Sequence, residues 1–384
     1  MRIATSTTNR GIAIIIVMVS MFALAILAGA FAYTMKVETR LAMNSDYETQ
    51  FQWAGRSGIE YCRWILAEGL REPGTGQRYD ALDQAWAGGS AETNDTLLQI
   101  AQTYHQPLSL GPGVVIKDKQ IVDLDRKVNV NSATGNPQLL QKALLRAGAE
   151  VTEIPDLISC IQDWIDPDDD PRVNGAESDY YRSLDPPYYA KNGSMDEVSE
   201  LLLVKGMTPE LYWGMQSTNH PSPIFQRQVV TANGIRPASS QGTVALRDLL
   251  TTTSSGVINI LTASPSQLQV LPQVDETLAG QIVQLRGEHD AAAGLAYANP
   301  AELLSYTSLG KDFAQQIAPY CTFRSTTFEI TVLVQVGLAE RTYFAVVRRN
   351  SPNDIPILSM RWEDGNHLQS SGDQQDSDST VAAR

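Results

Sequence analysis

A long uncharged segment near the N-terminus constrains the fold of this chain more than any other feature. Residues 1–11 contain two arginines and no acid, and residues 12–35 then run without a charged side chain until Lys36. About twenty apolar residues suffice to cross a bilayer as a helix. Positively charged flanks stay in the cytoplasm, so the sequence predicts a single-pass membrane protein whose C-terminal body lies outside the cytoplasm.

The same segment could instead be a secretory signal peptide, cleaved near Ala30 or Ala32, where small residues are suitably spaced. The uncharged run is longer than a typical signal core, however. Its helical character also continues to Leu70 without a proline. We therefore favour an uncleaved anchor that continues outside the membrane as one long amphipathic helix.

Composition excludes several classes of function. The formal net charge of -14 argues against a nucleic-acid partner, because phosphate binding depends on a local excess of Lys and Arg. The three cysteines form no CxxC pair, which excludes the usual zinc patterns. Cys62 and Cys321 could form a disulfide, in which case Cys160 would remain a buried thiol.

The remaining chain alternates between strand-like and helical patterns. Residues 113–125 predict a hairpin that turns at residues 117–120, and residues 131–320 are largely helical in pattern. Two alternating runs, 327–336 and 341–349, predict strands joined near Gly337. Strands on both sides of a helical block predict an α+β fold, in which a large helical domain is inserted into a small antiparallel sheet domain. The tail from residue 369 lacks apolar anchors and is expected to be disordered.

The helical block contains a weak internal repeat. Residues 128–134 resemble residues 258–264, and helix, turn and helix are expected after each. The second copy is similar to helix-hairpin-helix modules, which often bind the DNA backbone through a hairpin glycine. Gln273 stands at that position here, so the backbone could not approach a phosphate as closely. We favour a structural role, and a secreted nucleic-acid-binding protein of a DNA-uptake system stays as the alternative.

An acidic segment lies between the two repeats. Residues 163–179 hold seven carboxylates in seventeen residues, with Arg172 among them, and such oxygen ligands suit calcium. With Asp166 as position one, acidic or amide residues fall at positions three, five, nine and twelve, as in an EF-hand loop. Pro171 replaces the glycine at position six, so the geometry must differ from an EF-hand. A solvated acidic turn is the alternative to a structural calcium site, whose candidate ligands are Asp163, Asp166, Asp168, Asp170, Asn174 and Glu177.

The same acids could in principle serve catalysis, as in a periplasmic metal-dependent hydrolase. Two-metal and glycosidase sites draw their carboxylates from separate segments. Here the nearest histidine, His220, lies beyond a loop-rich stretch, and the sequence contains no G-x-S-x-G, P-loop or HExxH motif. We therefore predict that the chain is not an enzyme.

The N-terminal residues resemble a known processing signal. Arg10, Gly11 and the apolar run from Ile12 are similar to a class III prepilin signal, in which a peptidase cuts after the glycine and methylates the new N-terminus, here Ile12. Most pilins carry a glutamate at the fifth mature position, where this chain has Ile16. A carboxylate inside a membrane is costly unless it is paired. This departure and the helical insert resemble the K-type minor pseudopilins of type II secretion (general secretion pathway protein K).

The resemblance implies a non-enzymatic subunit of the tip complex that initiates and caps a pseudopilus for the export of folded proteins. It implies a single-pass inner-membrane protein with a periplasmic body, and it also favours calcium, since calcium sites occur in such pseudopilins. The implied partners are I- and J-type minor pseudopilins through the N-terminal helices, the major pseudopilin fibre, prepilin peptidase, the inner membrane and exported protein substrates, with no nucleic acid. The expected regions are a leader (1–11), a transmembrane helix (12–35), a stalk helix with the first part of a pilin-like domain (36–125), a SAM-like, helix-hairpin-helix insert (126–320), the C-terminal strands (321–365) and a tail (366–384).

Overall fold

The structure is a computed structural model. It describes residues 10–71, 79–89, 95–132, 135, 137–214, 229–231, 234–236, 244–287, 289–290, 294–295, 297–308 and 310–365. The leader through residue 9 and the tail from residue 366 lie outside the described residues, and so do the predictions made for them.

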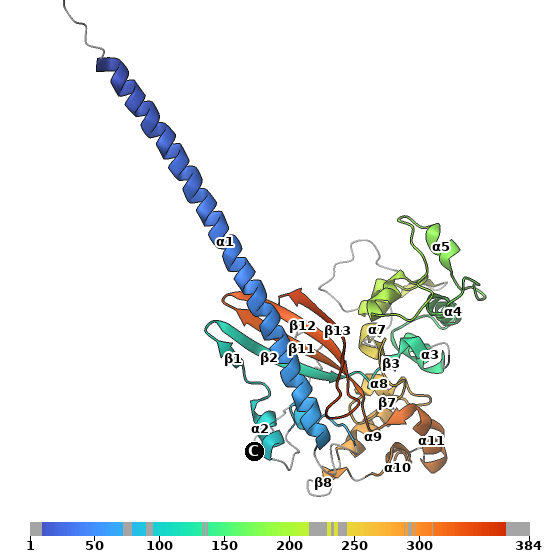
Figure 1. Cartoon of the computed structure of the whole chain (residues 1–384). Helices are drawn as coiled ribbons and strands as arrows, with labels where there is room; N and C mark the ends of the chain where they lie inside the picture. Colours follow the sequence, from blue (N-terminus) through green and yellow to red (C-terminus); the bar gives the residue numbers. More distant parts are fainter. Residues whose placement is uncertain are drawn as a thin grey trace, which may run out of the picture.

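One helix, α1 (Arg10–Arg71), extends from the membrane-like segment into the body of the protein. The segment Ile14–Thr39 is long and apolar enough to span a membrane, and none of it is buried within the protein. Figure 1 shows this end of α1 projecting away from the body, while its C-terminal end packs across a sheet. The prediction of a single long helix is confirmed.

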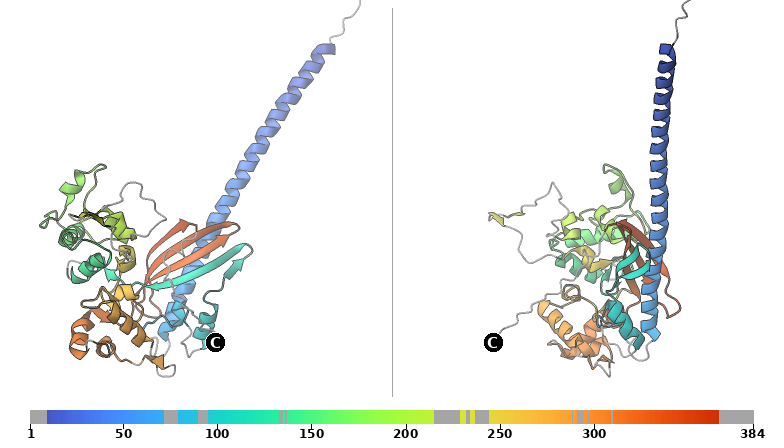
Figure 2. Two further views of the ribbon diagram at one scale, coloured as in Figure 1. Left: turned by 180° about the vertical axis from the view of Figure 1, so that it is seen from behind. Right: turned by 90° about the vertical axis from the view of Figure 1, so that its left-hand side faces the viewer.

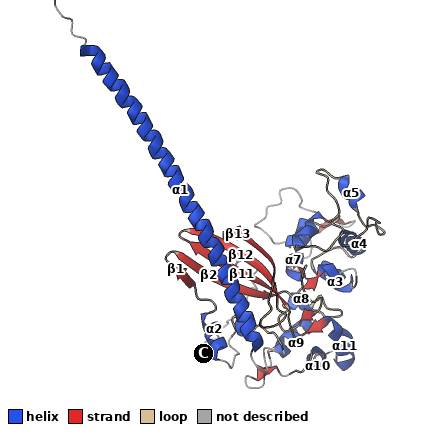
Figure 3. Cartoon of the chain, viewed as in Figure 1, coloured by secondary structure: helices blue, strands red, loops and turns tan. Residues whose placement is uncertain are grey.

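The sheet has five strands in the order β1-β2-β11-β12-β13, and every neighbouring pair is antiparallel (Figure 3). The two strands predicted near the C-terminus are present as β11 and β12, and Gly337 lies in their turn with a positive φ of 60°. The fifth strand, β13, was not predicted, although Leu358, Met360 and Trp362 alternate with polar residues in its sequence; its side chains are exposed along its whole length. The strands are β1 (Leu108–Gly111), β2 (Val114–Asp123), β11 (Thr327–Val336), β12 (Ala339–Arg348) and β13 (Ile357–Asp364).

The hairpin predicted at residues 117–120 is wrong. β2 runs straight through these residues, and the chain turns earlier, between Gly111 and Gly113. Lys119, which lies within the predicted turn, is buried, and its Nζ donates hydrogen bonds to the carbonyl oxygens of Tyr104 and Gln106. Because its charged end is satisfied inside the fold, this lysine can stand within a central part of the sheet.

Two glycines allow α1 to lie very close to the sheet. A Cβ atom on Gly55 would lie 2.6 Å from the Tyr343 ring, and one on Gly58 would lie 2.5 Å from Cγ1 of Val332. The helix and sheet share a hydrophobic core that includes Phe51 and Cys62.

The helical insert leaves the sheet after β2 and returns to it at β11. These strands are neighbours, and Asp123 pairs with Phe328 where the insert begins and ends. Figure 2 shows the insert beside the sheet, at the end of α1 remote from the apolar segment. It has its own core, which includes Cys321, whereas Cys62 lies in the core beneath α1. All three cysteines are free thiols, so the suggested disulfide is wrong.

The insert and its approach contain short elements apart from the main sheet. The α-helices are α2 (Asp95–Thr103), α3 (Pro137–Arg146), α4 (Ile154–Ile165), α5 (Ser178–Arg182), α6 (Pro209–Trp213), α7 (Leu246–Leu249), α8 (Pro265–Leu268), α9 (Glu276–Arg286), α10 (Pro300–Ser305) and α11 (Gly310–Ile317). The 3-10 helices are η1 (Ala85–Ala87), η2 (Val130–Ser132), η3 (Val198–Leu203) and η4 (Ala318–Tyr320). The short strand pairs are β3 (Val128–Asn129) with β6 (Leu250–Thr251), β7 (Ile258–Asn259) with β10 (Cys321–Thr322), β4 (Val229–Thr231) with β5 (Gly234–Arg236), and β8 (His289–Asp290) with β9 (Gly294–Leu295).

The internal repeat is visible in the hydrogen bonds. Asn129 Oδ1 accepts from the N–H of Asn131, and Asn259 Oδ1 accepts in the same way from the N–H of Leu261, each at 3.0 Å. Both asparagines thus stabilise the same local turn. In the second copy, Gln273 has a positive φ of 61°, so it adopts the conformation that a hairpin glycine would otherwise supply.

Candidate metal centre

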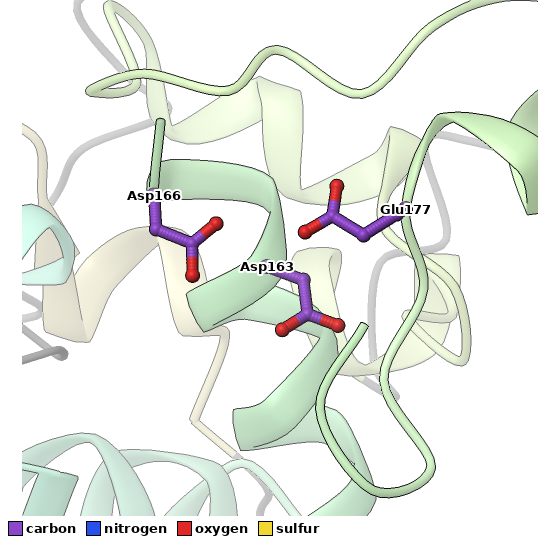
Figure 4. Close-up of side chains that lie close together, drawn as sticks. All are labelled: Asp163, Asp166 and Glu177. Atoms are coloured by element: carbon purple, nitrogen blue, oxygen red, sulfur yellow. The ribbon is translucent and has the colours of Figure 1, made fainter. Parts of the chain in front are cut away.

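Three carboxylates from the acidic segment converge in the insert. Asp163 lies in the last turn of α4, Asp166 directly follows that helix, and Glu177 directly precedes α5. Each offers one oxygen, and these atoms all lie within 4.8 Å of one another. Figure 4 shows the three side chains facing a common space between the end of α4 and the returning loop.

Asp163 organises the loop between α4 and α5. It is completely buried, and its carboxylate accepts hydrogen bonds from the backbone N–H of Ala176 at 2.8 Å and from that of Arg172 at 3.2 Å. A Cβ atom on Gly175 would lie 1.9 Å from Asp163 Oδ2, so this close approach requires glycine. Lys205 Nζ donates to the Gly175 carbonyl oxygen at 3.2 Å and ties the loop to the following segment.

The other predicted ligands lie outside this cluster. Asp168 and Asp170 are exposed, and Asp168 Oδ1 accepts from the N–H of Asp170 at 3.0 Å. Asn174 has a positive φ of 63°, and its amide donates to Asp156 Oδ1 at 2.9 Å, away from the three carboxylates. The structure therefore brings together Asp163, Asp166 and Glu177 and places Asp168, Asp170 and Asn174 elsewhere.

Glu177 is the most unusual member of the cluster. It is only 3% exposed, yet neither of its carboxylate oxygens has a hydrogen-bond partner in the described part of the chain. Burial is the main cause that raises the pKa of Glu177 to about 7, and the negative charges of Asp163 and Asp166 contribute to the same rise. One oxygen of Asp166, Oδ1, is also buried without a partner.

These orphaned oxygens fit a hard divalent cation. Buried charged oxygens are costly unless they are paired or coordinate a metal. Calcium takes oxygen ligands from carboxylates, backbone carbonyls and water, whereas structural zinc sites use cysteine and histidine. The donor set of Asp163, Asp166 and Glu177 consists of oxygen alone, so calcium fits it and zinc does not.

Arg172 is the cation that the cluster contains in this structure. Its Nη1 lies 2.8 Å from Asp163 Oδ1 and also contacts Asp166 Oδ2, and both carboxylates raise the pKa of the guanidinium. Sequence reasoning noted Arg172 only as a single positive charge, and it gave Gly175 no role. The many acidic residues around Arg172 and Gly175 indicated that this segment could hold a cation. The contacts of Arg172 and Gly175 with Asp163, however, depend on the path of the loop.

Comparison with known proteins gives consistent matches along the chain. Residues 121–217, which include the acidic loop, match the family model described as type II secretion system (T2SS), protein K. Residues 253–322 match the model of the helix-hairpin-helix motif.

Curated relatives carry the same description. The chain is 26% identical over 209 residues to a putative type II secretion system protein K of Escherichia coli (strain K12), covering 53% of this chain and 60% of that protein. It is 39% identical over 75 residues to type II secretion system protein K of Pectobacterium carotovorum subsp. carotovorum, and 36% identical over 75 residues to that of Klebsiella pneumoniae. Each of these shorter matches covers 20% of this chain and 23% of the relative. The chain thus spans less than two thirds of the length of each of these relatives.

A solved structure shares the fold. A chain of the GspK-GspI-GspJ complex from the enterotoxigenic Escherichia coli Type 2 Secretion System superposes with a TM-score of 0.60 and 17% sequence identity. The alignment covers 85% of this chain and 100% of that chain. The part of this chain that the alignment covers therefore has a fold already known from such a complex.

Proposed function

We infer that this chain, which belongs to the type II secretion system protein K family, is a minor pseudopilin of the tip complex that initiates and caps a pseudopilus. The single observation that carries this proposal is the two-part helix α1. Its segment Ile14–Thr39 is apolar and unburied, while the following turns pack against the sheet through Phe51, Ala54 and Ile59. Such a helix can hold the protein in the inner membrane and present its body in the periplasm.

Processing would free the N-terminus of this anchor. The signal around Gly11 supports cleavage before Ile12 and methylation of Ile12 by a prepilin peptidase. The mature helix would then carry Ile16, which is exposed, at the position where most pilins have a glutamate. A subunit without that carboxylate has no charge to pair with the amino terminus of a subunit above it, which favours a place at the tip.

The outward face of α1 offers a surface for other minor pseudopilins. Trp53 is 67% exposed and Trp64 is 40% exposed. They are eleven residues apart, about three helical turns, and therefore share one face. That face points away from the sheet, because Phe51, Ala54 and Ile59 occupy the opposite one. We propose that the Trp53–Trp64 face packs against the N-terminal helices of I- and J-type subunits.

The insert would supply the cap, and calcium would stabilise the insert. The bulky domain lies at the end of α1 remote from the apolar segment (Figure 2). A calcium ion held by Asp163, Asp166 and Glu177 would tie α4 to α5. Because such an ion binds the folded loop, it would stabilise the insert by mass action and take no part in covalent chemistry. The role proposed is assembly, with no enzymatic step.

Two measurements test this function. Mass spectrometry of the membrane-extracted protein should find a mature chain that begins at methylated Ile12; a chain beginning near Phe31 would contradict the proposal.

The double variant Trp53→Ala, Trp64→Ala should bind the I- and J-type subunits at least tenfold more weakly, a loss of about 1.4 kcal/mol in binding free energy. The control is Tyr189→Ala, which removes an aromatic ring that is 66% exposed on the insert. Equal binding by both variants would exclude the Trp53–Trp64 face as the contact.

The helix-hairpin-helix match makes nucleic-acid binding the second candidate. Its hairpin, however, places Asp275 and Glu276 at the start of α9, two and three residues after Gln273. These acids would repel a phosphate that approached the helix N-terminus. We therefore propose that the motif packs the insert. Salt-sensitive binding of the full chain to duplex DNA would favour the alternative instead.

A further inference from the structure

We propose that Arg172 is an internal counter-ion that occupies the cation position in the acidic cluster and is displaced when calcium binds. This inference rests on the calcium site proposed above. It concerns what determines the affinity of that site for calcium. It follows from the contacts of Arg172, from the lack of hydrogen bonds to the Glu177 carboxylate, and from the solvent exposure of the Arg172 side chain.

The guanidinium of Arg172 bridges two of the three converging carboxylates. Nη1 donates to Asp163 Oδ1 at 2.8 Å and also to Asp166 Oδ2. Asp163 is completely buried and Asp166 is only 11% exposed in its side chain, so both depend on this positive charge. A calcium ion between the same carboxylates would compete for these oxygens and would be repelled by the guanidinium.

Arg172 satisfies the cluster only in part. Glu177 receives no hydrogen bond at either oxygen although it is almost completely buried. Three carboxylates therefore face one positive charge, and one of the three is left without a partner. A divalent ion brings twice the charge and accepts six to eight oxygen ligands, so it could engage all three carboxylates at once.

The position of Arg172 allows it to leave without disturbing the core. Its side chain is 39% exposed, so the guanidinium has access to solvent. The backbone N–H groups of Arg172 and Ala176 hold the loop on Asp163 independently of the guanidinium. Rotation of one side chain into solvent would therefore open the cation position while the loop keeps its path.

The variant Arg172→Gln separates competition from simple structural support. Without the guanidinium, calcium no longer has to displace a charge-assisted hydrogen bond, so its affinity should rise by about tenfold or more. The calcium-free protein should melt at a lower temperature than the wild type, because Asp163 loses its counter-charge. The calcium-saturated protein should melt at nearly the same temperature as the wild type.

The control is Arg182→Gln. Arg182 lies at the end of the neighbouring helix α5, where its Nη1 is 3.8 Å from the fully exposed Asp179, so the substitution removes the same charge without touching the cluster. Its calcium affinity should rise only slightly. Arg172→Lys keeps the charge but cannot form the planar fork, so its calcium affinity should lie between those of the wild type and Arg172→Gln. This variant replaces Arg172→Gln in the test if Arg172→Gln folds poorly without calcium.

Calorimetric titration of the detergent-solubilised full chain with calcium chloride measures the calcium affinity. Thermal melts in EGTA and in excess calcium measure the stability of the calcium-free and calcium-bound protein. Calcium binding to Arg172→Gln that is no tighter than binding to Arg182→Gln would overturn the proposal, as would an equal fall in melting temperature with and without calcium. If neither the wild type nor any variant binds calcium, the calcium site itself fails as well. The tip function is tested separately by the N-terminal residue and by binding to partner subunits.

Discussion

Arg349 and Asp80 form an ion pair in the interior, with 2.6 Å between Nη2 and Oδ1 and 2% of each side chain exposed. Asp80 also accepts from the N–H of Ser325 at 2.8 Å, and Arg349 donates to the Ser325 carbonyl oxygen at 2.8 Å. The pair thus joins three segments: the chain that follows the stalk helix, the return from the insert and the end of β12. It lies where the insert meets the sheet domain.

Loss of this arginine should be far more costly than loss of a surface partner. Arg349→Met would leave the Asp80 carboxylate buried without its counter-charge, and we expect a loss of about 3–5 kcal/mol in the free energy of unfolding. Lys117→Met is the control, because it breaks the exposed cross-strand pair of Lys117 and Glu340 and should cost about 0–1 kcal/mol. Urea unfolding measures both. Similar losses for the two variants would show that the buried pair does not hold the junction.

Asp123 should make the same junction sensitive to pH. Its carboxylate accepts from the hydroxyls of Ser325 and Thr262 and from the amide of Asn259, and among the described residues no cationic side chain pairs with it. The pKa of Asp123 is raised from 3.8 to about 7. Burial is the main cause and the negative charges of Asp125 and Asp80 add to it, while the hydroxyl hydrogen bonds of Ser325 and Thr262 partly oppose the rise. The folded state therefore favours the protonated acid.

The sign of the pH dependence follows from this raised pKa. The stabilising contribution of Asp123 is fully present below the unfolded pKa of about 4 and is lost as the pH rises through about 7. Relative to Asp123→Asn, which does not titrate, the wild type should lose a few kcal/mol of stability across this interval. Urea unfolding in EGTA at several pH values measures the difference. Parallel profiles for the two proteins would contradict the expectation.

Helix α1 should tolerate an added methyl group at one glycine and not at another. Gly58→Ala places a Cβ 2.5 Å from Val332 and 3.2 Å from Ile116, and the overpacking should cost about 1–3 kcal/mol. Gly69 lies on the same helix, and its added Cβ would meet no described atom within 4 Å, so Gly69→Ala should gain up to about 1 kcal/mol of helix propensity. Thermal melts of the two variants should therefore shift in opposite directions. Shifts of the same sign would mean that the close approach of helix and sheet is not required.

The sequence predicted the features that depend on periodicity and failed where long-range contacts decide. The apolar run and its amphipathic continuation give α1, and alternation gives β11 and β12. The prediction of a turn at residues 117–120 failed because the local sequence does not reveal the hydrogen-bond partners of Lys119, which are two carbonyl groups near the end of α2. Likewise, acidic density located the candidate metal centre, but EF-hand spacing did not identify which carboxylates converge. That depends on the loop path set by Gly175 and the buried Asp163.

Gly175 therefore offers the sharpest test of the loop path. In Gly175→Ala the new Cβ would lie 1.9 Å from Asp163 Oδ2, so the loop must move away from α4. We expect a loss of about 1–3 kcal/mol in stability from this overpacking, and weaker calcium binding because Glu177 would move with the loop. Gly193→Ala is the matched control in the same domain, since its Cβ would meet only the Lys191 carbonyl oxygen at 3.8 Å. Calorimetric titration and thermal melts of both variants measure the two effects. If Gly175→Ala binds calcium as tightly as Gly193→Ala, the contact between the loop and Asp163 does not position the carboxylates, and the ligands must be sought among the exposed acids Asp168 and Asp170.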